Sequence, residues 1–341
     1  MMQRDLLNEP ISKLAYRLRE SLDLYQQDIQ SKNTLLTDFI NTAFRYNPWF
    51  TAENVVAGLD LFIEELHLLS KTLPEETWDS PGVSKNIGFV YNSSRPFECL
   101  SEIIFTAFSN FNCKVMTTPD DKMLFRKFII LIENAGLKLS RVAEVDNLKQ
   151  CDGYVIFKKL NDTSKQYFSK YPILELNAGD IKGSSLIITG KEDEADLIKT
   201  ADCFCLFFGR SIKNVKLFFI PHEYNLSILE NYLQKYNDQL LHHRYFNNYE
   251  YRKSVMIINH IPFTEAAPIL ITDQTDQAGY TSVLALARYN NIKECFSNEL
   301  QKSFPALNFH GNKISDITLS AFKTNLLLLK QFLNETKSDR K

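Results

Sequence analysis

Histidine and cysteine side chains that lie close together are the first places in this sequence to look for chemistry. His242 and His243 are adjacent in LHHRYFNNYEYR, and Cys203 and Cys205 lie in DCFCLFF. Two imidazoles on a helix can hold one metal ion when they are four residues apart, because that spacing places them on one face. Adjacent helical residues point about 100° apart. The histidine pair is therefore more typical of a helix end whose side chains satisfy backbone groups.

The cysteine pattern does not indicate a metal centre. Cys203 and Cys205 share a face only on a strand, and no second Cys/His pair lies near them. No C-x-x-C pair occurs, since the other four are scattered, at Cys99, Cys113, Cys151 and Cys295. We therefore predict no metal site, thiols that mostly act as small core residues, and a reducing, cytoplasmic location.

Motifs for nucleotide binding and serine chemistry are missing from the sequence. Neither G-x-G-x-x-G, nor the P-loop pattern, nor a G-x-S-x-G elbow occurs. Glycine is scarce, with 11 in 341 residues, against an average of about 7%. The acidic run at 192–196 is typical of a helix N-terminus, where negative charge offsets the macrodipole. Any nucleotide would therefore bind without a glycine-rich phosphate loop.

The charges nearly balance, with 39 Lys and Arg against 41 Asp and Glu and a net charge of −2. No global field would attract nucleic acid or an anionic membrane. The N-terminal stretch carries charges where a signal peptide needs an apolar core, and no apolar run approaches ~20 residues. We expect no nucleic-acid partner and no membrane span. The cations that could meet a phosphate are expected to be solvated at the surface: Arg244, Arg252, Lys213, Lys216 and Lys235.

Two kinds of segment must position these residues. Residues 1–80 have helical periodicity, with Thr51 as a plausible N-cap, and the stretch 74–85 is a candidate hinge. From residue 86 short apolar runs alternate with helical stretches, which predicts parallel βαβ units and an α/β fold. The predicted strands are 86–92, 113–118, 153–158, 184–190, 215–221, 254–259 and 267–272.

Three stretches taken together resemble one family: 47–59 (NPWFTAENVVAGL), 207–225 (FFGRSIKNVKLFFIPHEYN) and 236–259 (YNDQLLHHRYFNNYEYRKSVMIIN). They are similar to segments of the LuxC-type acyl-CoA reductases. These are NADPH-linked enzymes of the aldehyde dehydrogenase superfamily that reduce long-chain acyl thioesters to aldehydes. The similarity runs from about residue 45 to about residue 290.

The resemblance implies an aldehyde dehydrogenase-like α/β fold in four parts. They are a helical segment at 1–80, a Rossmann-like cofactor domain at 81–198 that ends with SSLIITG, a catalytic-type α/β domain at 199–330, and a frayed tail at 331–341. Such folds bind NADP or NAD without the G-x-G-x-x-G fingerprint. The glycine count therefore does not exclude a dinucleotide.

The resemblance also locates the reacting centre. In this family a cysteine thiolate in a Phe-Gly-x-Gly-Cys-Arg-Asn-Val segment attacks the acyl thioester. Here the matching run is 208–215, FGRSIKNV, which puts Ser211 at the second glycine and Ile212 at the nucleophile position. Isoleucine can neither attack a carbonyl nor hold a covalent acyl group.

Two further departures affect the positions that would face the cofactor and the oxyanion. The family's Gly-Asn-x-Pro loop reads SSRP at 93–96, with Ser94 where an amide would help to stabilise an oxyanion. The Gly-Ser-Asn-type turn reads KKLN at 158–161, which is bulkier where backbone must approach the cofactor. The resemblance makes Ser94, Pro96 and Lys159 the candidate cofactor contacts.

Two side chains could substitute for the lost nucleophile. Cys205 lies seven residues before Ile212, but its apolar neighbours raise a thiol pKa and leave it inert, so core packing is the alternative role. Ser211 adjoins the lost position, but the sequence indicates no general base for it. The sequence therefore assigns no catalytic residue.

Two functions follow from this pattern. The first is NADPH-linked reduction of an acyl-CoA or acyl-carrier thioester through a rearranged site. The second is a non-catalytic homologue, a pseudoenzyme, that binds an acyl thioester, a nucleotide, a protein partner or a second copy of itself. The departures at Ser94, Lys159 and Ile212 favour the second.

Overall fold

The computed structural model describes residues 2–27, 34–72, 85–91, 93–157, 166–168, 170–176, 183–211, 214–297, 307–309 and 314–338. The chain divides into two compact units. The first unit comprises residues 1–178 and 322–341, and the second unit comprises residues 179–321. Each unit has its own sheet and helices, so the predicted α/β class is confirmed.

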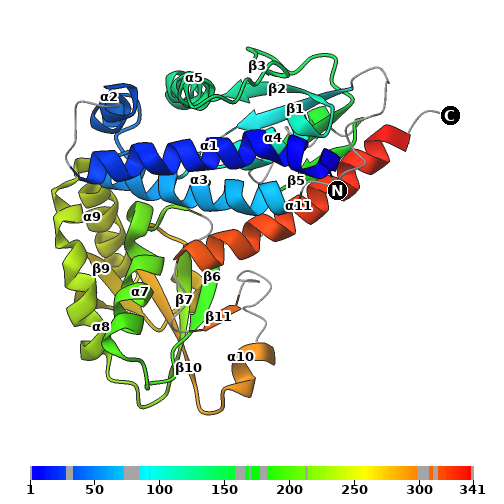
Figure 1. Ribbon diagram of the computed structural model, residues 1–341. Coiled ribbons are helices and arrows are strands. Elements are labelled where there is room, and N and C mark those ends of the chain that lie inside the picture. The colour runs from blue at the N-terminus through cyan, green and yellow to red at the C-terminus, as the bar shows by residue number, and fades with distance from the viewer. Residues whose placement is uncertain are drawn as a thin grey trace. The chain divides into compact units, whose positions relative to one another are not determined.

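The sheet of the first unit is parallel throughout, in the order β3-β2-β1-β4-β5 (Figure 1). Its strands are β1 (Asn86–Tyr91), β2 (Asn112–Thr117), β3 (Val142–Glu144), β4 (Gly153–Ile156) and β5 (Ile173–Glu175). The helices α4 (Leu100–Phe108) and α5 (Pro119–Asn134) follow β1 and β2. The central strands are apolar and buried, as expected for a doubly wound sheet whose strands start from the middle and proceed outward.

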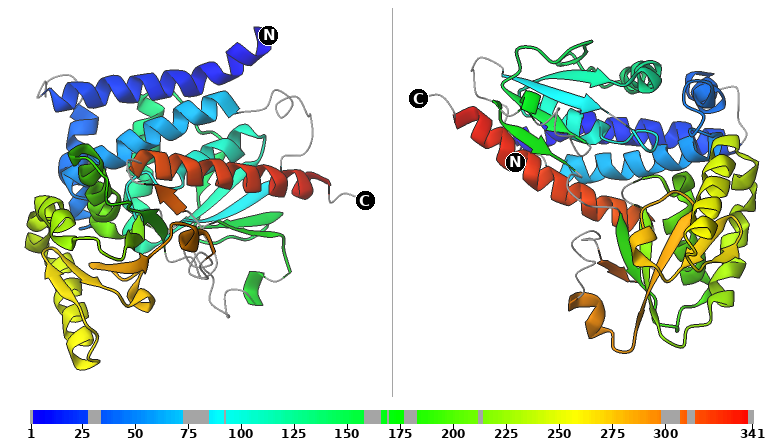
Figure 2. Two further views of the ribbon diagram at one scale, coloured as in Figure 1. Left: turned by 90° about the horizontal axis from the view of Figure 1, so that it is seen from below. Right: turned by 180° about the vertical axis from the view of Figure 1, so that it is seen from behind.

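Further helices complete the first unit: α1 (Met2–Gln26), α2 (Thr34–Thr42), η1 (Ala43–Arg45), α3 (Ala52–Thr72) and the first-unit part of α11 (Ile314–Ser338). The helices α1 and α3 lie side by side (Figures 1 and 2). Thr51 caps α3 as predicted, because its hydroxyl accepts the N–H of Asn54 at 3.4 Å. One apolar core joins these helices to the sheet, including Phe322 and Phe332 of α11.

The sheet of the second unit has the order β11-β6-β7-β10-β9-β8, and only the β8–β9 pair is antiparallel. Its strands are β6 (Ser184–Ile187), β7 (Val215–Pro221), β8 (Thr264–Ala266), β9 (Ile269–Thr272), β10 (Val283–Tyr289) and β11 (Leu307–Phe309). Its helices are α7 (Glu194–Cys205), η3 (Leu206–Gly209), α8 (Leu226–Leu233), η4 (Gln234–Leu241), α9 (His243–Ile258), η5 (Thr275–Gln277) and α10 (Lys293–Ser297).

The strand assignments differ from the prediction in several places, since one predicted strand is helical and β3, β5, β8, β10 and β11 were not predicted. The segment 254–259 continues helix α9, and its alternation is helical because Met256 is buried while Ile257 and Ile258 are exposed. Strand β10 was missed, since VLALARY has no strand-specific pattern. Residues 184–187, expected to close the cofactor domain, pair with β7 in the sheet of the second unit. The sequence of this buried strand carries no mark of the sheet that it joins.

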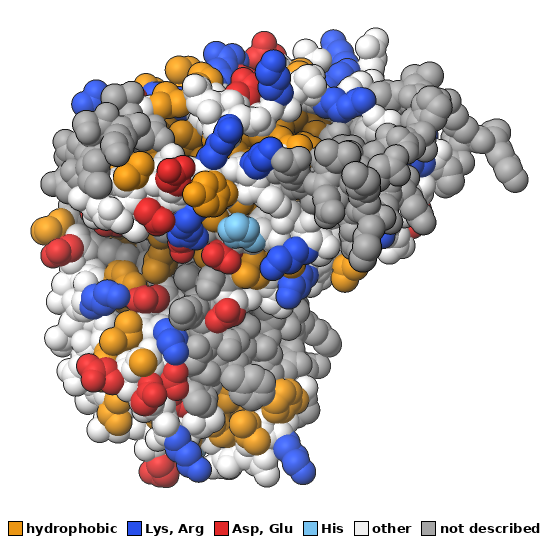
Figure 3. Space-filling model, viewed as in Figure 1, with side chains coloured by type: hydrophobic (Ala, Val, Ile, Leu, Met, Phe, Trp, Pro, Cys, Tyr) orange, Lys and Arg blue, Asp and Glu red, His pale blue; other side chains and the backbone are white. Residues whose placement is uncertain are grey.

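The surface carries both signs of charge. Figure 3 shows Lys and Arg side chains interspersed with Asp and Glu over one face, which agrees with the near-zero net charge. No helix in the described part of the chain is long and apolar enough to cross a membrane.

Candidate functional site

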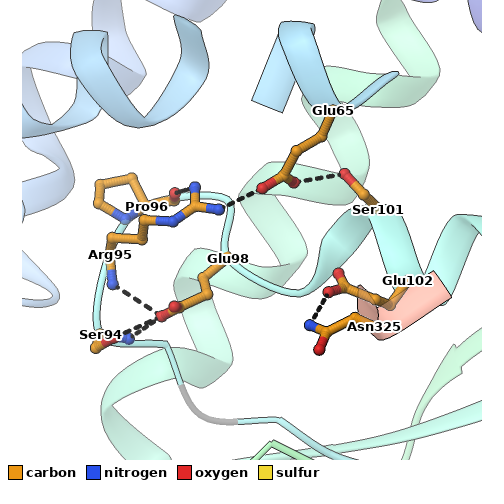
Figure 4. Close-up of polar contacts among 8 residues, drawn as sticks. All are labelled: Glu65, Ser94, Arg95, Pro96, Glu98, Ser101, Glu102 and Asn325. Atoms are coloured by element: carbon orange, nitrogen blue, oxygen red, sulfur yellow. Dashed lines mark hydrogen bonds and ion pairs between the residues drawn. The ribbon is translucent and has the colours of Figure 1, made fainter. Parts of the chain in front are cut away.

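The turn between β1 and α4 contains Ser94 and Pro96, two of the predicted cofactor contacts. It lies at the carboxyl end of a central parallel strand, where ligands bind in doubly wound sheets. Ser94 donates its backbone N–H and its hydroxyl to Glu98 Oε2, at 2.7 and 2.6 Å (Figure 4). The N–H of Arg95 donates to the same oxygen at 3.2 Å. Donors converging in this way bind anions, and here the anion is a carboxylate of the protein itself.

A second carboxylate binds the start of the same turn. The hydroxyl and the N–H of Ser93 donate to Asp121 at 2.8 and 3.4 Å, and the Thr118 hydroxyl adds a bond of 2.8 Å. Burial raises the pKa of Asp121, while the bonds from Ser93 and Thr118 oppose that shift. Because a serine hydroxyl has one proton, the hydroxyls of Ser93 and Ser94 are both committed within the first unit.

Arg95 and Pro96 attach the turn to helix α3. The Arg95 guanidinium is 1% exposed and donates to Glu65 at 2.5 Å, and Ser101 donates to the other oxygen of Glu65 at 2.8 Å (Figure 4). Burial lowers the pKa of Arg95, but Glu65 and other carboxylates outweigh it and the net shift is upward. A Cβ on Gly58 would lie 2.8 Å from Pro96, so glycine permits this close packing. In this arrangement Arg95 and Pro96 hold the turn in place.

Two of the sequence-derived positions lie outside the described residues. They are Lys159, with the turn 158–161, and Ile212 at the predicted nucleophile position. The residues on both sides of Ile212 are described as far as Ser211 and from Asn214. Ser211 is 1% exposed, and its carbonyl accepts the N–H of Asn214 at 3.0 Å.

In the second unit, the backbone leading to this position is unusual. Helix α7 ends at Cys205, and the three residues Phe207, Phe208 and Gly209 have φ of 57°, 57° and 62°. Glycine adopts this left-handed conformation freely, whereas bulky side chains rarely do. Strain of this kind clusters at functional sites.

Two side-chain amides hold the turn against the end of α7. The side-chain amide of Asn214 donates to the carbonyls of Cys203, Phe204 and Leu206, at 2.9, 3.4 and 3.1 Å. The amide of Gln239 donates to the carbonyl of Cys205 at 2.9 Å. These bonds satisfy carbonyls that a helix end leaves without backbone partners. Asn214, which matches the asparagine of the family segment, therefore has a structural role in this unit.

The histidine pair lies at a helix end, as predicted. His242 Nδ1 accepts the N–H of Tyr245 at 3.3 Å and so caps α9. The ring of Phe208 lies 4.6 Å from that of His242 and 5.5 Å from that of Tyr245. Two of the three stretches that carry the resemblance, 207–225 and 236–259, are thus in contact. Among the described residues, no group of three or more His, Cys, Asp or Glu side chains could hold a metal ion.

All six cysteines are described, and all six are buried. Cys205 is 2% exposed, and burial followed by Asp202 raises its pKa well above the usual value. Burial also raises the pKa of Cys203 to about 12 and that of Cys295 to about 11. Thiols in such surroundings are protonated at neutral pH and unreactive.

One functional group was misjudged from the sequence. Lys216 was expected to be a solvated cation, but it is 3% exposed, in the second position of β7. Burial, then Arg210, lowers its pKa to about 7, and Cys205 acts in the opposite direction. The sequence already indicated this burial, because Lys216 alternates with Phe218 and Ile220 on one face of an apolar strand.

The comparisons with known proteins decide the fold. No family model matches this chain, and no curated protein matches it. Among solved structures, betaine aldehyde dehydrogenase from Staphylococcus aureus in complex with NAD+ is similar, with a TM-score of 0.60 and 9% identity over 91% of this chain and 76% of that one. This chain has the aldehyde dehydrogenase fold.

Two other solved structures agree with it. A mutant of aldehyde dehydrogenase C from Pseudomonas syringae, in complex with NAD+ and octanal, gives a TM-score of 0.58 at 10% identity over 94% of this chain and 74% of that one. An oxidoreductase from Marinobacter aquaeolei gives 0.59 at 7% identity over 94% and 76%. The predicted fold type is confirmed, and the narrower resemblance to acyl-CoA reductases stays a prediction.

Proposed function

We propose that this protein is an aldehyde dehydrogenase-fold protein that binds a carbonyl compound without reducing an acyl thioester through a cysteine. One observation carries the proposal: all six cysteines are buried, and burial raises the thiol pKa wherever a shift is resolved. Acyl transfer to an enzyme needs a nucleophile that is deprotonated or beside a base. None of the six buried thiols therefore meets the requirement for the nucleophilic attack on an acyl thioester that the resemblance implies.

The turn after β1 supports the same proposal. Stabilising an oxyanion requires donors aimed at the place where charge develops. The N–H groups of Ser94 and Arg95 and the Ser94 hydroxyl are bound to Glu98 instead. A substrate oxygen would have to displace a buried carboxylate, which is 3% exposed, to reach them.

A nicotinamide dinucleotide is the cofactor to test, because two of the similar structures hold NAD+. NADP, implied by the resemblance, is the finer prediction. The described residues fit a dinucleotide phosphate poorly, since Glu98 occupies the turn after β1 and Asp120 stands exposed in the first turn of α5. Negative charge at a helix N-terminus opposes phosphate binding there.

The test uses the full chain with a long-chain acyl-CoA and NADPH or NADH. We expect no oxidation of the reduced dinucleotide, no release of coenzyme A, and no acyl group on the protein by intact-mass measurement. Reductive turnover with an acylated protein, both lost in Cys205→Ala, would instead establish the reductase that the resemblance implies. Circular dichroism of each sample checks that the fold is intact.

A further inference from the structure

Lys216 is a lysine whose side chain is buried within the second unit. Its stem lies on the inward face of β7, in the row of Phe218 and Ile220, which belong to the apolar core that also contains Phe204 and Cys205. Lysine is almost never buried without a partner. Among the described residues, no carboxylate forms an ion pair with it and no acceptor takes a hydrogen bond from it.

One of the few glycines makes room for this side chain, because a Cβ on Gly183 would collide with Lys216 Cγ. Gly209 marks where the amine ends, since a Cβ there would lie in ordinary contact with Lys216 Nζ, at 3.6 Å. Gly209 is also the last residue of the left-handed turn, with φ of 62°. The amine therefore ends beside the strained segment Phe207–Gly209, three residues before the predicted nucleophile position.

The charges around the amine favour its neutral form. The titratable and charged groups that act on it are Arg210, from the residue after the turn, and Cys205, from the end of α7. The strand β6 beside it contributes Ser184 and Ser185, which do not titrate. Burial and Arg210 lower the pKa of Lys216 to about 7, so a large fraction is uncharged at neutral pH. An uncharged lysine amine is a nucleophile toward carbonyl carbon.

We propose that Lys216 binds an aldehyde covalently, as a reversible imine, at the turn formed by Phe207–Gly209. The inference rests on the proposed function, since it names the group that holds the carbonyl compound. The nitrogen lone pair forms a C–N bond to the carbonyl carbon, and the carbonyl oxygen takes up the two protons that the amine nitrogen gives up. Loss of that oxygen as water leaves C=N. No oxidant or reductant takes part, and hydrolysis returns the aldehyde.

Borohydride trapping tests this on the full chain. The protein is incubated with octanal and sodium cyanoborohydride, whose hydride converts an imine to a stable secondary amine. Intact mass and peptide mapping then locate the adduct. We expect one adduct, on Lys216, formed with a rate that rises through about pH 7, whereas an ordinary lysine titrates near pH 10.

Matched variants separate this site from surface reactivity. Lys216→Met should lose the adduct, while Lys191→Met, which alters an exposed lysine of the same unit, should keep it. Adducts spread over exposed lysines with Lys216 unmodified would overturn the inference, and mapping of the unaltered chain decides this even if Lys216→Met fails to fold. That result together with no acyl-CoA turnover leaves the proposed function standing. Turnover through an acylated cysteine overturns the proposed function itself.

Discussion

At the scale of single residues, burial decides which groups are reactive. The same apolar core holds Cys205, whose pKa is raised, and Lys216, whose pKa is lowered. Both shifts have one cause, because a core of low dielectric constant disfavours the charged form of each group. For a thiol the neutral form is inert, whereas for an amine the neutral form is the nucleophile. Because of burial, the amine of Lys216 can act as a nucleophile at neutral pH, whereas the thiol of Cys205 cannot.

Lys216→Met should stabilise the protein below about pH 7. The unfolded lysine has a pKa near 10.4 and the folded one about 7, so between these values the unfolded chain binds more protons and stability rises with pH. The cost of burying the amine is largest below about pH 7, on the order of 5 kcal/mol, and absent above about pH 10. Urea unfolding of both proteins across this range should give free energies that converge at high pH. A difference that does not change with pH would contradict the buried, neutral amine.

At the scale of elements, sequence periodicity predicted most helices and central strands, but not what the turns contain. The turn 93–96 could be placed after a strand from its sequence alone. That Glu98 turns back onto Ser94 was not predictable, because a carboxylate four residues ahead is also compatible with a solvated helix start. The ion pair of Arg95 with Glu65, 30 residues earlier, depends on tertiary packing. Long-range partners of this kind leave no periodic signal.

Glu98→Ala should destabilise the first unit by about 3 kcal/mol, because three donors lose a charged acceptor and buried donors are left without partners. Glu98→Gln keeps one carbonyl acceptor of the same shape, so its loss should be smaller, about 1 kcal/mol. Chemical unfolding of the unaltered protein, Glu98→Ala and Glu98→Gln gives the free energy of unfolding of each, and so the order of the three. Equal losses in the two variants would mean that the negative charge does not hold the turn. A gain of stability in either would contradict the anion-binding arrangement.

At the scale of the whole molecule, the first unit is discontinuous in sequence. Its core takes five residues from α11, about 150 residues after the last strand of its sheet: Phe322, Leu326, Leu329, Phe332 and Leu333. Gly153 in β4 is packed against the ring of Phe332, since a Cβ there would lie 2.8 Å from it. No boundary drawn along the sequence assigns a C-terminal helix to an N-terminal sheet. The predicted linear domain order differs from the observed units for this reason.

Removal of residues 322–341 should therefore unfold the first unit selectively. The loss of a buried phenylalanine costs about 3–5 kcal/mol, and two are lost together with three leucines, which approaches the total stability of an ordinary domain. The second unit is continuous, and its apolar cores contain none of these residues. Hydrogen exchange should show protection lost over β1–β5 and retained in β6, β7 and β10, while a control lacking only residues 339–341 keeps both. Loss of protection in β7 and β10 as well would mean that the two units fold as one, and the buried environment of Lys216 would then depend on the whole chain.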